Sequence, residues 1–427
     1  MYPGPMGVVR CPVECPGCKG KITLRLGVGM DARQPFFYVC GDCKAATKGA
    51  LLLDSTKEGP TTEVELEAGH ILDSFDGCTQ TIHLNPEIPS VADAPDFSHP
   101  GGSAFIFHFQ NLGPERMQFW EHQVQEFEHF VRNGWPALKR LTAYYLNSDW
   151  PRFDKAVPEL VEGMPEIKEQ WRREDVIHQL YDHAFLVLLA LGPPHYPEMK
   201  LEWNALWDST RPNWRAMTAF AAREAGTGGF HQLQRDVFHL LEQFTDLRRT
   251  LAAGFLLDMY PPGKEKERDG LRMFRDDFPM LRDFYIQAFE KCHRGLRYVI
   301  GAVNAEARGN ENAFPAWPSK PFSRPDKVLK NLDEFEKLVN ANKRLWLKTL
   351  PKWDNVWDEF FDRSFRNDIG HASVRHQLSD GVLVRDDDPP QPYLDFVRRA
   401  ARVGNPILML LNVLKILCIY ANPGATP

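Results

Sequence analysis

Two Cys-x-x-Cys pairs near the start of the chain, Cys15-Pro-Gly-Cys18 and Cys40-Gly-Asp-Cys43, constrain its fold more than any other feature. Each pair lets two thiolates converge on one ion, and two pairs complete the tetrahedral four-sulfur set of a structural zinc site. Five of the eight cysteines fall within the first 43 positions. This concentration predicts a metal site, because disulfide scaffolds belong mainly to small secreted chains.

The stretch between the two pairs has the pattern of β-strands. Ile22, Leu24 and Leu26 alternate with polar neighbours, which is typical of a strand with one buried face. Residues 36–39, Phe-Phe-Tyr-Val, are predicted to form its partner strand. With its two cysteine pairs this segment resembles a zinc ribbon, which implies a zinc ion that staples the fold and takes no part in catalysis. Cys11 is either an alternative ligand or a spare cysteine.

Strand-like patterns continue to about residue 110. Segments 62–67, 79–84 and 104–109 alternate in polarity or are rich in β-branched or aromatic residues, and prolines punctuate the run. We therefore predict that residues 1–112 form one small β domain of the zinc-ribbon type. Nothing in these residues indicates what the domain binds.

The composition is that of an ordinary globular protein of 427 residues, 43% hydrophobic and 25% charged. A net charge of −6 gives no overall attraction to nucleic acid, so any RNA contact needs a local basic patch. Pro, Gly and Cys interrupt the first thirty residues, where a secretory signal needs an apolar run. The most apolar stretch, residues 406–421, is interrupted by Asn412 and Lys415 and is too short to span a bilayer. We expect a cytoplasmic protein with no membrane contact.

From residue 114 the apolar residues recur at helical spacing, which predicts a helical middle region over residues 113–210. Two long apolar stripes follow, at 233–255 and 281–303, and a last helix is expected from about residue 393 to 420. Between them, Ser323 and Asp326 have the spacing of a helix N-terminal cap. The sequence thus predicts a mainly α protein in which residues 211–427 form a helical bundle.

A candidate catalytic motif, Phe365-Arg366-Asn367-Asp368-Ile369-Gly370-His371, precedes the last predicted helix. Histidine changes charge near neutral pH, so His371 is suited to move a proton from or to the reacting oxygens of RNA. Arg366 is permanently charged and fork-shaped, and it can stabilise the negative charge that develops on phosphorus. Asn367 and His371 are four positions apart, so on a helix they would share a face and the amide could orient the imidazole.

This motif, followed by a polar turn and a closing apolar helix, resembles the HEPN superfamily of helical domains, whose pattern is an arginine, four to six residues and a histidine. The resemblance covers residues 211–421 and implies a metal-independent endoribonuclease that leaves 2′,3′-cyclic phosphate and 5′-hydroxyl ends. It implies catalytic roles for Arg366, Asn367 and His371, and a homodimer in which two motifs face one cleft. It further implies an RNA substrate such as tRNA, a role in toxin or antiviral defence, and control by a protein activator or inhibitor.

Two other classes of function remain open at this point. The first is a non-catalytic binding or regulatory protein, with the zinc ribbon as its interaction module and the bundle as a dimeric platform. The second is a nucleotide-binding partner of a nucleotidyltransferase carried on another chain. No Gly-Ser motif with paired aspartates, the mark of such a transferase, is visible in this sequence.

The motif residues also have simple structural interpretations. Asp368 could pair with Arg363 or Arg366 on an exposed helix face, and His371 could cap a helix C-terminus. Three residues just downstream are either phosphate contacts or solvated surface: Arg375, His376 and Arg385.

Overall fold

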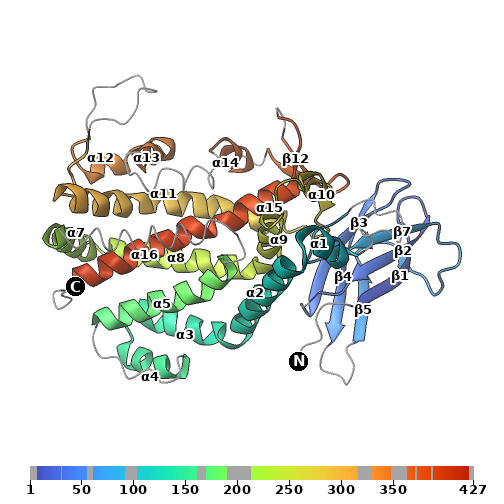
Figure 1. Cartoon of the computed structure of the whole chain (residues 1–427), viewed down its shortest axis with the longest axis horizontal. Coiled ribbons are helices and arrows are strands. Elements are labelled where there is room, and N and C mark those ends of the chain that lie inside the picture. Colours follow the sequence, from blue (N-terminus) through green and yellow to red (C-terminus); the bar gives the residue numbers. More distant parts are fainter. Residues whose placement is uncertain are drawn as a thin grey trace. The chain divides into compact units, whose positions relative to one another are not determined.

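The computed structural model describes ten segments of the chain, namely residues 7–29, 31–54, 61–91, 103–160, 170–189, 213–315, 329–347, 363–370, 373–385 and 388–422. In these segments the protein is mainly α-helical, as the sequence predicts, and it carries four small β-sheets (Figure 1). The chain divides into two compact units, each assembled from three separate segments. Unit 1 comprises 1–121, 247–282 and 368–401, and unit 2 comprises 122–246, 283–367 and 402–427.

The β part of unit 1 is built around two strand–turn–strand hairpins. Strands β1 (Val8–Glu14) and β2 (Lys21–Gly27) pair antiparallel, and so do β3 (Arg33–Val39) and β4 (Ala46–Asp54). Two further strands, β6 (His70–Ile71) and β7 (Gln80–Leu84), extend the first sheet to the order β6-β1-β2-β7, while β5 (Thr61–Leu66) completes β3-β4-β5. Alternate residues of both sheets, among them Leu24, Phe37 and Leu51, are buried in a shared core.

Two details of the predicted β domain are wrong. Residues 36–39 belong to β3, which pairs with β4, whereas β2 pairs with β1 and runs parallel to β7. Residues 104–109 are not a strand but the start of helix α1 (Ala104–Leu112). Ser103 caps this helix, because its side chain accepts a hydrogen bond from the backbone N–H of Ile106. The cap and the helical burial of Ala104, Phe107 and His108 outweigh the aromatic bias toward a strand.

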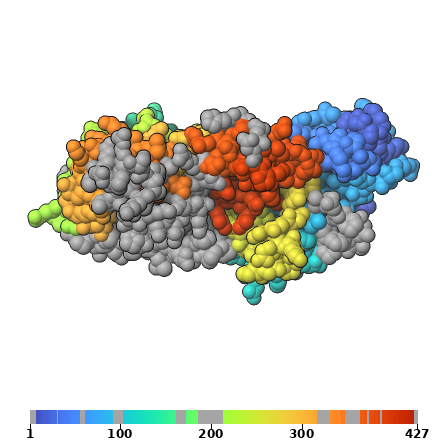
Figure 2. All heavy atoms as spheres, turned by 90° about the horizontal axis from the view of Figure 1, so that it is seen from above, coloured from blue at the N-terminus to red at the C-terminus, as the bar shows by residue number. Residues whose placement is uncertain are grey.

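The rest of unit 1 is a helical layer with two small sheets. Helix α1, the first residues of α2 (Pro114–Asn133), α9 (Arg248–Asp258), α10 (Glu265–Asp269) and most of α15 (Tyr393–Arg402) lie here. Strands β8 (Ser90–Val91) and β9 (Leu271–Arg272) form one sheet, and β10 (Arg375–Gln377), β11 (Val382–Val384) and β12 (Gln391–Pro392) form the other. In Figure 2 the orange-red surface that includes β10–β12 adjoins the yellow surface that includes α10, and Gly381 lies against the Arg272 side chain.

Helices α9 and α15 approach each other closely at Gly254. A Cβ atom at this position would lie 2.9 Å from the carbonyl oxygen of Val397 and 3.0 Å from Cβ of Ala401. Only glycine fits there, which fixes the contact between the two helices. An ion pair at the same contact joins Arg398 to Asp258 at 2.6 Å.

Unit 2 is an array of helices packed around α16 (Gly404–Ala421). Its helices in chain order are most of α2, α3 (Trp135–Leu146), α4 (Trp150–Leu160), α5 (Gln170–Leu189), α7 (Trp214–Gly226), α8 (Gly229–Asp246), most of α11 (Phe278–Arg308), α12 (Leu332–Glu336), α13 (Asn340–Leu347), the first residues of α14 (Arg363–Gly370) and α16. Helix α16 contacts α5, α7 and α8 (Figure 1), and Leu410 of α16 packs on Gly295 of α11.

Three predicted helices differ from those observed. The stripe at 233–255 is two helices, α8 and α9, that meet at Leu247. The last predicted helix is also two, α15 and α16, and Pro406 stands in the first turn of α16, where its missing N–H costs no hydrogen bond. The helix expected around residue 332 is only the five residues of α12, and Asn331 is its cap. The predicted cap at Ser323 and Asp326 lies outside the described residues.

Among the described residues, one helical stretch is long and apolar enough to cross a membrane. It covers Tyr393–Ala421, with a mean hydropathy of 1.7 in its most apolar window, and 78% of that window is buried inside the protein. Such burial is expected of a core helix surrounded by other helices, because a spanning helix needs an apolar face for lipid. The stretch is therefore a core element, as the sequence predicts.

Candidate functional site

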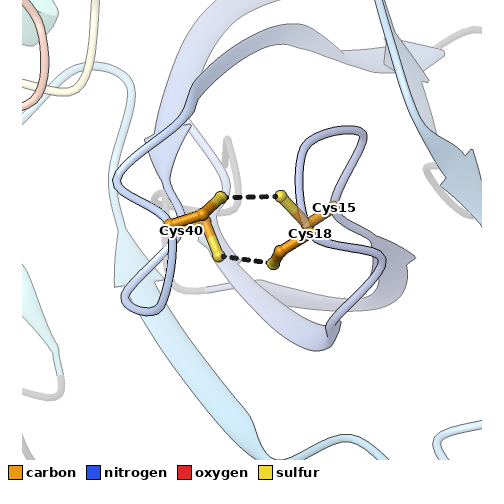
Figure 3. Close-up of side chains that lie close together, drawn as sticks. Cys15, Cys18 and Cys40 are labelled. Carbon is orange, nitrogen blue, oxygen red and sulfur yellow. Dashed lines mark hydrogen bonds between the residues drawn. The ribbon is translucent and has the colours of Figure 1, made fainter.

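The four paired cysteines form one cluster that can hold a metal ion. The Sγ atoms of Cys15, Cys18, Cys40 and Cys43 all lie within 4.8 Å of one another. Figure 3 shows the two hairpin turns facing each other across the cluster. The sulfurs of Cys15 and Cys43 lie 3.6 Å apart, and so do those of Cys18 and Cys40. Four thiolates in this arrangement leave no open coordination position, which is the mark of a structural site.

Both hairpin turns have the same backbone conformation. In the first, the N–H of Lys19 donates to the carbonyl of Cys15 at 3.0 Å, and in the second, Lys44 donates to Cys40 at the same distance. Lys19 and Lys44 adopt positive φ angles of 62° and 60°, which turn the chain back toward its own strand. Glycine suits position 17 of the first turn, since a Cβ there would lie 3.1 Å from Sγ of Cys43, closer than most Cβ contacts. The two turns are thus repeated units that present two sulfurs each.

The polypeptide shifts the pKa values of the clustered thiols in opposite directions. The backbone N–H of Ala45 donates to the sulfur of Cys43 and lowers the pKa of that thiol to about 7. Burial raises the pKa of Cys40 to about 12, so this sulfur needs a cation beside it to ionise at neutral pH. Cys11 lies outside the cluster, buried in the core of the two sheets, which identifies it as a packing residue and not a ligand.

The predicted catalytic arginine lies in unit 2 and is held by a carboxylate. Arg366 forms an ion pair with Glu290 of α11 and donates to the side-chain oxygen of its neighbour Asn367 at 3.3 Å. Its guanidinium lies over the ring of Phe289, 5.5 Å from the ring centre. The Arg366 side chain remains 28% exposed. The third predicted catalytic residue, His371, lies outside the described residues.

Asp368 pairs with an arginine that the sequence analysis did not consider for it. In unit 1 its carboxylate accepts from Arg385 at 2.9 Å, and the same Arg385 also pairs with Asp388 at 2.8 Å. Arg385 is only 10% exposed and is therefore neither solvated surface nor a free phosphate contact. Of the three downstream residues, only Arg375 is exposed.

The His376 side chain is likewise buried in the interior of unit 1. Its Nδ1 lies 3.0 Å from a carboxylate oxygen of Asp276, its ring stacks on Tyr393 with centres 4.1 Å apart, and its side chain is 3% exposed. The other oxygen of Asp276 accepts from Lys48 at 2.7 Å. Burial alone would raise the pKa of Asp276, but the hydrogen bonds from His376 and Lys48 outweigh it and lower the pKa to about 2.

Replacing Asp276 by asparagine is expected to reduce stability by about 2 kcal/mol at neutral pH, since the pKa falls from an unfolded value near 3.8 to about 2. This contribution is complete above about pH 5 and is lost as the pH falls through the folded pKa of about 2, below which the carboxyl is protonated in both states. Denaturant unfolding of wild type and Asp276→Asn at pH 7, 4 and 2.5 should give curves that converge in acid. Asp395→Asn, at an exposed carboxylate, is the control, and a difference independent of pH would contradict the assignment.

Arg366 is one of three basic residues that act on a buried histidine, an arrangement that the sequence pattern did not reveal. Lys343 and Arg344 of α13, together with Arg366, all lower the pKa of His293 of α11, as their positive charges must from nearby positions. Burial is the largest cause of that shift and brings the pKa of His293 to about 3, so the imidazole is neutral at physiological pH. These residues are dispersed over three helices, and only the fold brings them together.

No family model, curated protein or solved structure matches this chain. The candidate sites therefore stand on their own chemistry and geometry: a four-cysteine metal cluster in unit 1, and Arg366 within a group of basic residues in unit 2.

Proposed function

We propose that this protein is a metal-independent endoribonuclease of the HEPN type that acts in the cytoplasm. The observation that carries the proposal is the environment of Arg366, a partly exposed guanidinium with further cations on a neighbouring helix, just before the last helices of a helical array. Such a group of charges is the local basic patch that an acidic protein needs in order to hold RNA. Its biological role is proposed to be toxin activity or antiviral defence.

The proposed reaction is an internal transesterification. A base removes the proton of the ribose 2′-hydroxyl, and the 2′-oxygen forms a bond to phosphorus as the bond from phosphorus to the 5′-oxygen breaks. An acid gives a proton to the departing 5′-oxygen, so that the products are a 2′,3′-cyclic phosphate and a 5′-hydroxyl. His371 supplies one of these proton transfers, Arg366 stabilises the charge on phosphorus, and Asn367 orients its neighbours.

One histidine cannot serve as base and acid in the same step. A homodimer, with His371 of a second copy, would complete the pair. The metal cluster is proposed to bind zinc and to hold the fold of the β part of unit 1, where all four ligands lie.

The test of this proposal is the chemistry of the RNA ends. Purified protein is incubated with labelled tRNA and with an unstructured RNA, in a buffer to which no divalent ions are added. The expected products carry 2′,3′-cyclic phosphates, which phosphatase removes only after acid opening, and 5′-hydroxyls, which a kinase labels directly. Ends with 3′-hydroxyls and 5′-phosphates would overturn the mechanism.

A second candidate is a non-catalytic binding protein. One observation favours it: the carboxylate of Glu290 already forms an ion pair with Arg366. Under this alternative the protein retains RNA or a partner protein without cutting it. Intact RNA after incubation, with or without cell extract as a source of activators, would support this candidate over the nuclease.

A further inference from the structure

The four cysteines of the metal cluster differ in their access to solvent. Cys15 and Cys40, the first members of the two sequence pairs, are buried, whereas Cys18 and Cys43, the second members, are exposed. The thiolate is the form of cysteine that reacts with oxidants, and its reactivity depends on whether an oxidant can reach it. Each hairpin turn therefore presents one sulfur to a dissolved oxidant and shields the other.

The close sulfur contacts join an exposed cysteine to a buried one. Sγ of Cys18 lies 3.6 Å from Sγ of Cys40, and Sγ of Cys43 lies 3.6 Å from Sγ of Cys15. Both contacts cross between the turns, since each turn contributes one sulfur to each contact. Four cysteines can form two disulfides in three ways. The geometry favours the way that links the turns through Cys15–Cys43 and Cys18–Cys40.

The link between the two turns also joins two β-sheets. The first turn connects β1 to β2 in the sheet β6-β1-β2-β7, and the second connects β3 to β4 in the sheet β3-β4-β5. A metal ion bound by all four sulfurs holds these sheets together, and two disulfides that cross between the turns would do the same. Disulfides within a turn, Cys15–Cys18 and Cys40–Cys43, would leave the turns unlinked at this point.

We propose that the metal cluster is also an oxidation site for peroxides, at which two disulfides between the turns reversibly replace the zinc ion. This inference rests on zinc binding as part of the proposed function, and it is independent of the nuclease activity. Thiol reductants keep most cytoplasmic cysteines reduced, so the disulfides are a transient state that these reductants reverse. The protein thereby exchanges its metal for covalent bonds without separating its sheets.

The oxidation balances with roughly two molecules of hydrogen peroxide per cluster. The thiolate of Cys18 attacks a peroxide oxygen, so that an S–O bond forms, the O–O bond breaks and hydroxide leaves. The thiolate of Cys40 then attacks the Cys18 sulfur, so that an S–S bond forms, the S–O bond breaks and a second hydroxide leaves. Cys43 and Cys15 react in the same way. Each disulfide gives two electrons to one peroxide, and protons from solvent convert every hydroxide to water. After the first disulfide only two thiolates remain, fewer than the four ligands of a structural zinc site.

The experiment follows zinc release from zinc-loaded, full-length protein treated with hydrogen peroxide. A chromogenic chelator should detect one zinc ion per chain, released as roughly two molecules of peroxide are consumed. Trypsin separates the two turns into peptides 11–19 and 34–44. Fragmentation of these peptides in a mass spectrometer should assign Cys15 to Cys43 and Cys18 to Cys40. Dithiothreitol and added zinc should then restore the loaded cluster.

The matched variant combines Cys18→His with Cys43→His. Imidazole is a common zinc ligand, so this variant retains four ligands but loses both exposed thiols. Under peroxide it should release zinc at least about tenfold more slowly than wild type, because buried thiols are inert. Cys78→Ser, outside the cluster, should release zinc at the wild-type rate. The disulfide assignment in wild type tests the proposal even where the histidine variant does not bind zinc.

Limited proteolysis tests whether the sheets stay linked after oxidation. The oxidised protein should resist cleavage within residues 7–91, because disulfides take over the link between the turns. Protein stripped of zinc by a chelator under reducing conditions has neither link and should be cleaved there. Equal cleavage of the two forms would contradict the exchange of metal for disulfides.

Three further outcomes would overturn the inference. They are disulfides formed within the turns, oxidation of single sulfurs to sulfinic or sulfonic acid without any disulfide, and release of zinc from the histidine variant at the wild-type rate. Failure of the proposed zinc binding is distinguishable, because elemental analysis of the untreated protein would then find no zinc. Zinc that is present and stays bound under peroxide would reject the oxidation site alone.

Discussion

Replacing His371 by alanine is expected to lower the rate of RNA cleavage by at least about 100-fold, the usual contribution of a positioned acid or base. The alanine variant retains Arg366, Lys343 and Arg344, so it should still bind RNA with the affinity of wild type. The rate is measured in single turnover on end-labelled RNA with protein in excess. The affinity is measured on a 2′-O-methyl RNA, which lacks the attacking 2′-hydroxyl. A loss of rate without a loss of affinity is the signature of a residue that moves a proton.

The controls separate this role from a loss of structure. His183→Ala changes an exposed histidine of α5 and Arg140→Ala an exposed arginine of α3, and both should cut RNA at the wild-type rate. Arg366→Lys should recover part of the activity that Arg366→Ala loses, since lysine retains the charge but not the fork. Cleavage that survives both His371→Ala and Arg366→Ala would remove the motif from the reaction.

Loss of the metal is expected to unfold the β part of unit 1. Cys15→Ser combined with Cys40→Ser removes both buried ligands of the cluster, one from each hairpin turn. Structural zinc contributes roughly 10 kcal/mol or more of apparent binding energy in zinc-finger peptides, more than a small β domain can lose and stay folded. Elemental analysis should find one zinc ion per wild-type chain and none in the variant. Limited proteolysis should then cleave the variant within residues 7–91.

The matched control for this experiment is Cys78→Ser, which changes a half-buried cysteine of unit 1 that is not part of the cluster. It should retain one zinc ion and resist proteolysis. Cys11→Ser tests the alternative ligand considered from the sequence, and it too should retain the metal. A variant without the four-cysteine set that still holds one zinc ion per chain would contradict the proposed site.

The metal cluster could be predicted from the sequence because its information is local. Two residues between paired cysteines set the bite of each turn, and the predicted set Cys15, Cys18, Cys40 and Cys43 is the one that the fold brings within 4.8 Å. The helical character of the chain was also predictable, since apolar residues recur at 3.6-residue spacing within the sequence of each helix. Local rules were sufficient for both features.

Features that depend on long-range pairing could not be predicted. The parallel pairing of β2 with β7 joins Leu24 to Ile82, and nothing in the sequence of either strand indicates which strand it pairs with. The surroundings of Arg366 come from α11, α13 and α14, so Glu290 and Lys343 have no spacing relation to the motif. The ion pair of Asp368 was not expected either, because its partner Arg385 lies 17 residues away in the chain, beyond the paired strands β10 and β11.

The division of the chain into interleaved units has a consequence for its synthesis. Each unit takes its third segment from the last 60 residues, 368–401 for unit 1 and 402–427 for unit 2. While the ribosome still holds these residues, α9 lacks the neighbour that Gly254 fits and α5, α7 and α8 lack the helix that they enclose. Neither unit can therefore complete its core before its third segment has left the ribosome. A chain that stalls or is truncated near residue 360 would carry exposed apolar surface in both halves and would be a substrate for proteolytic quality control.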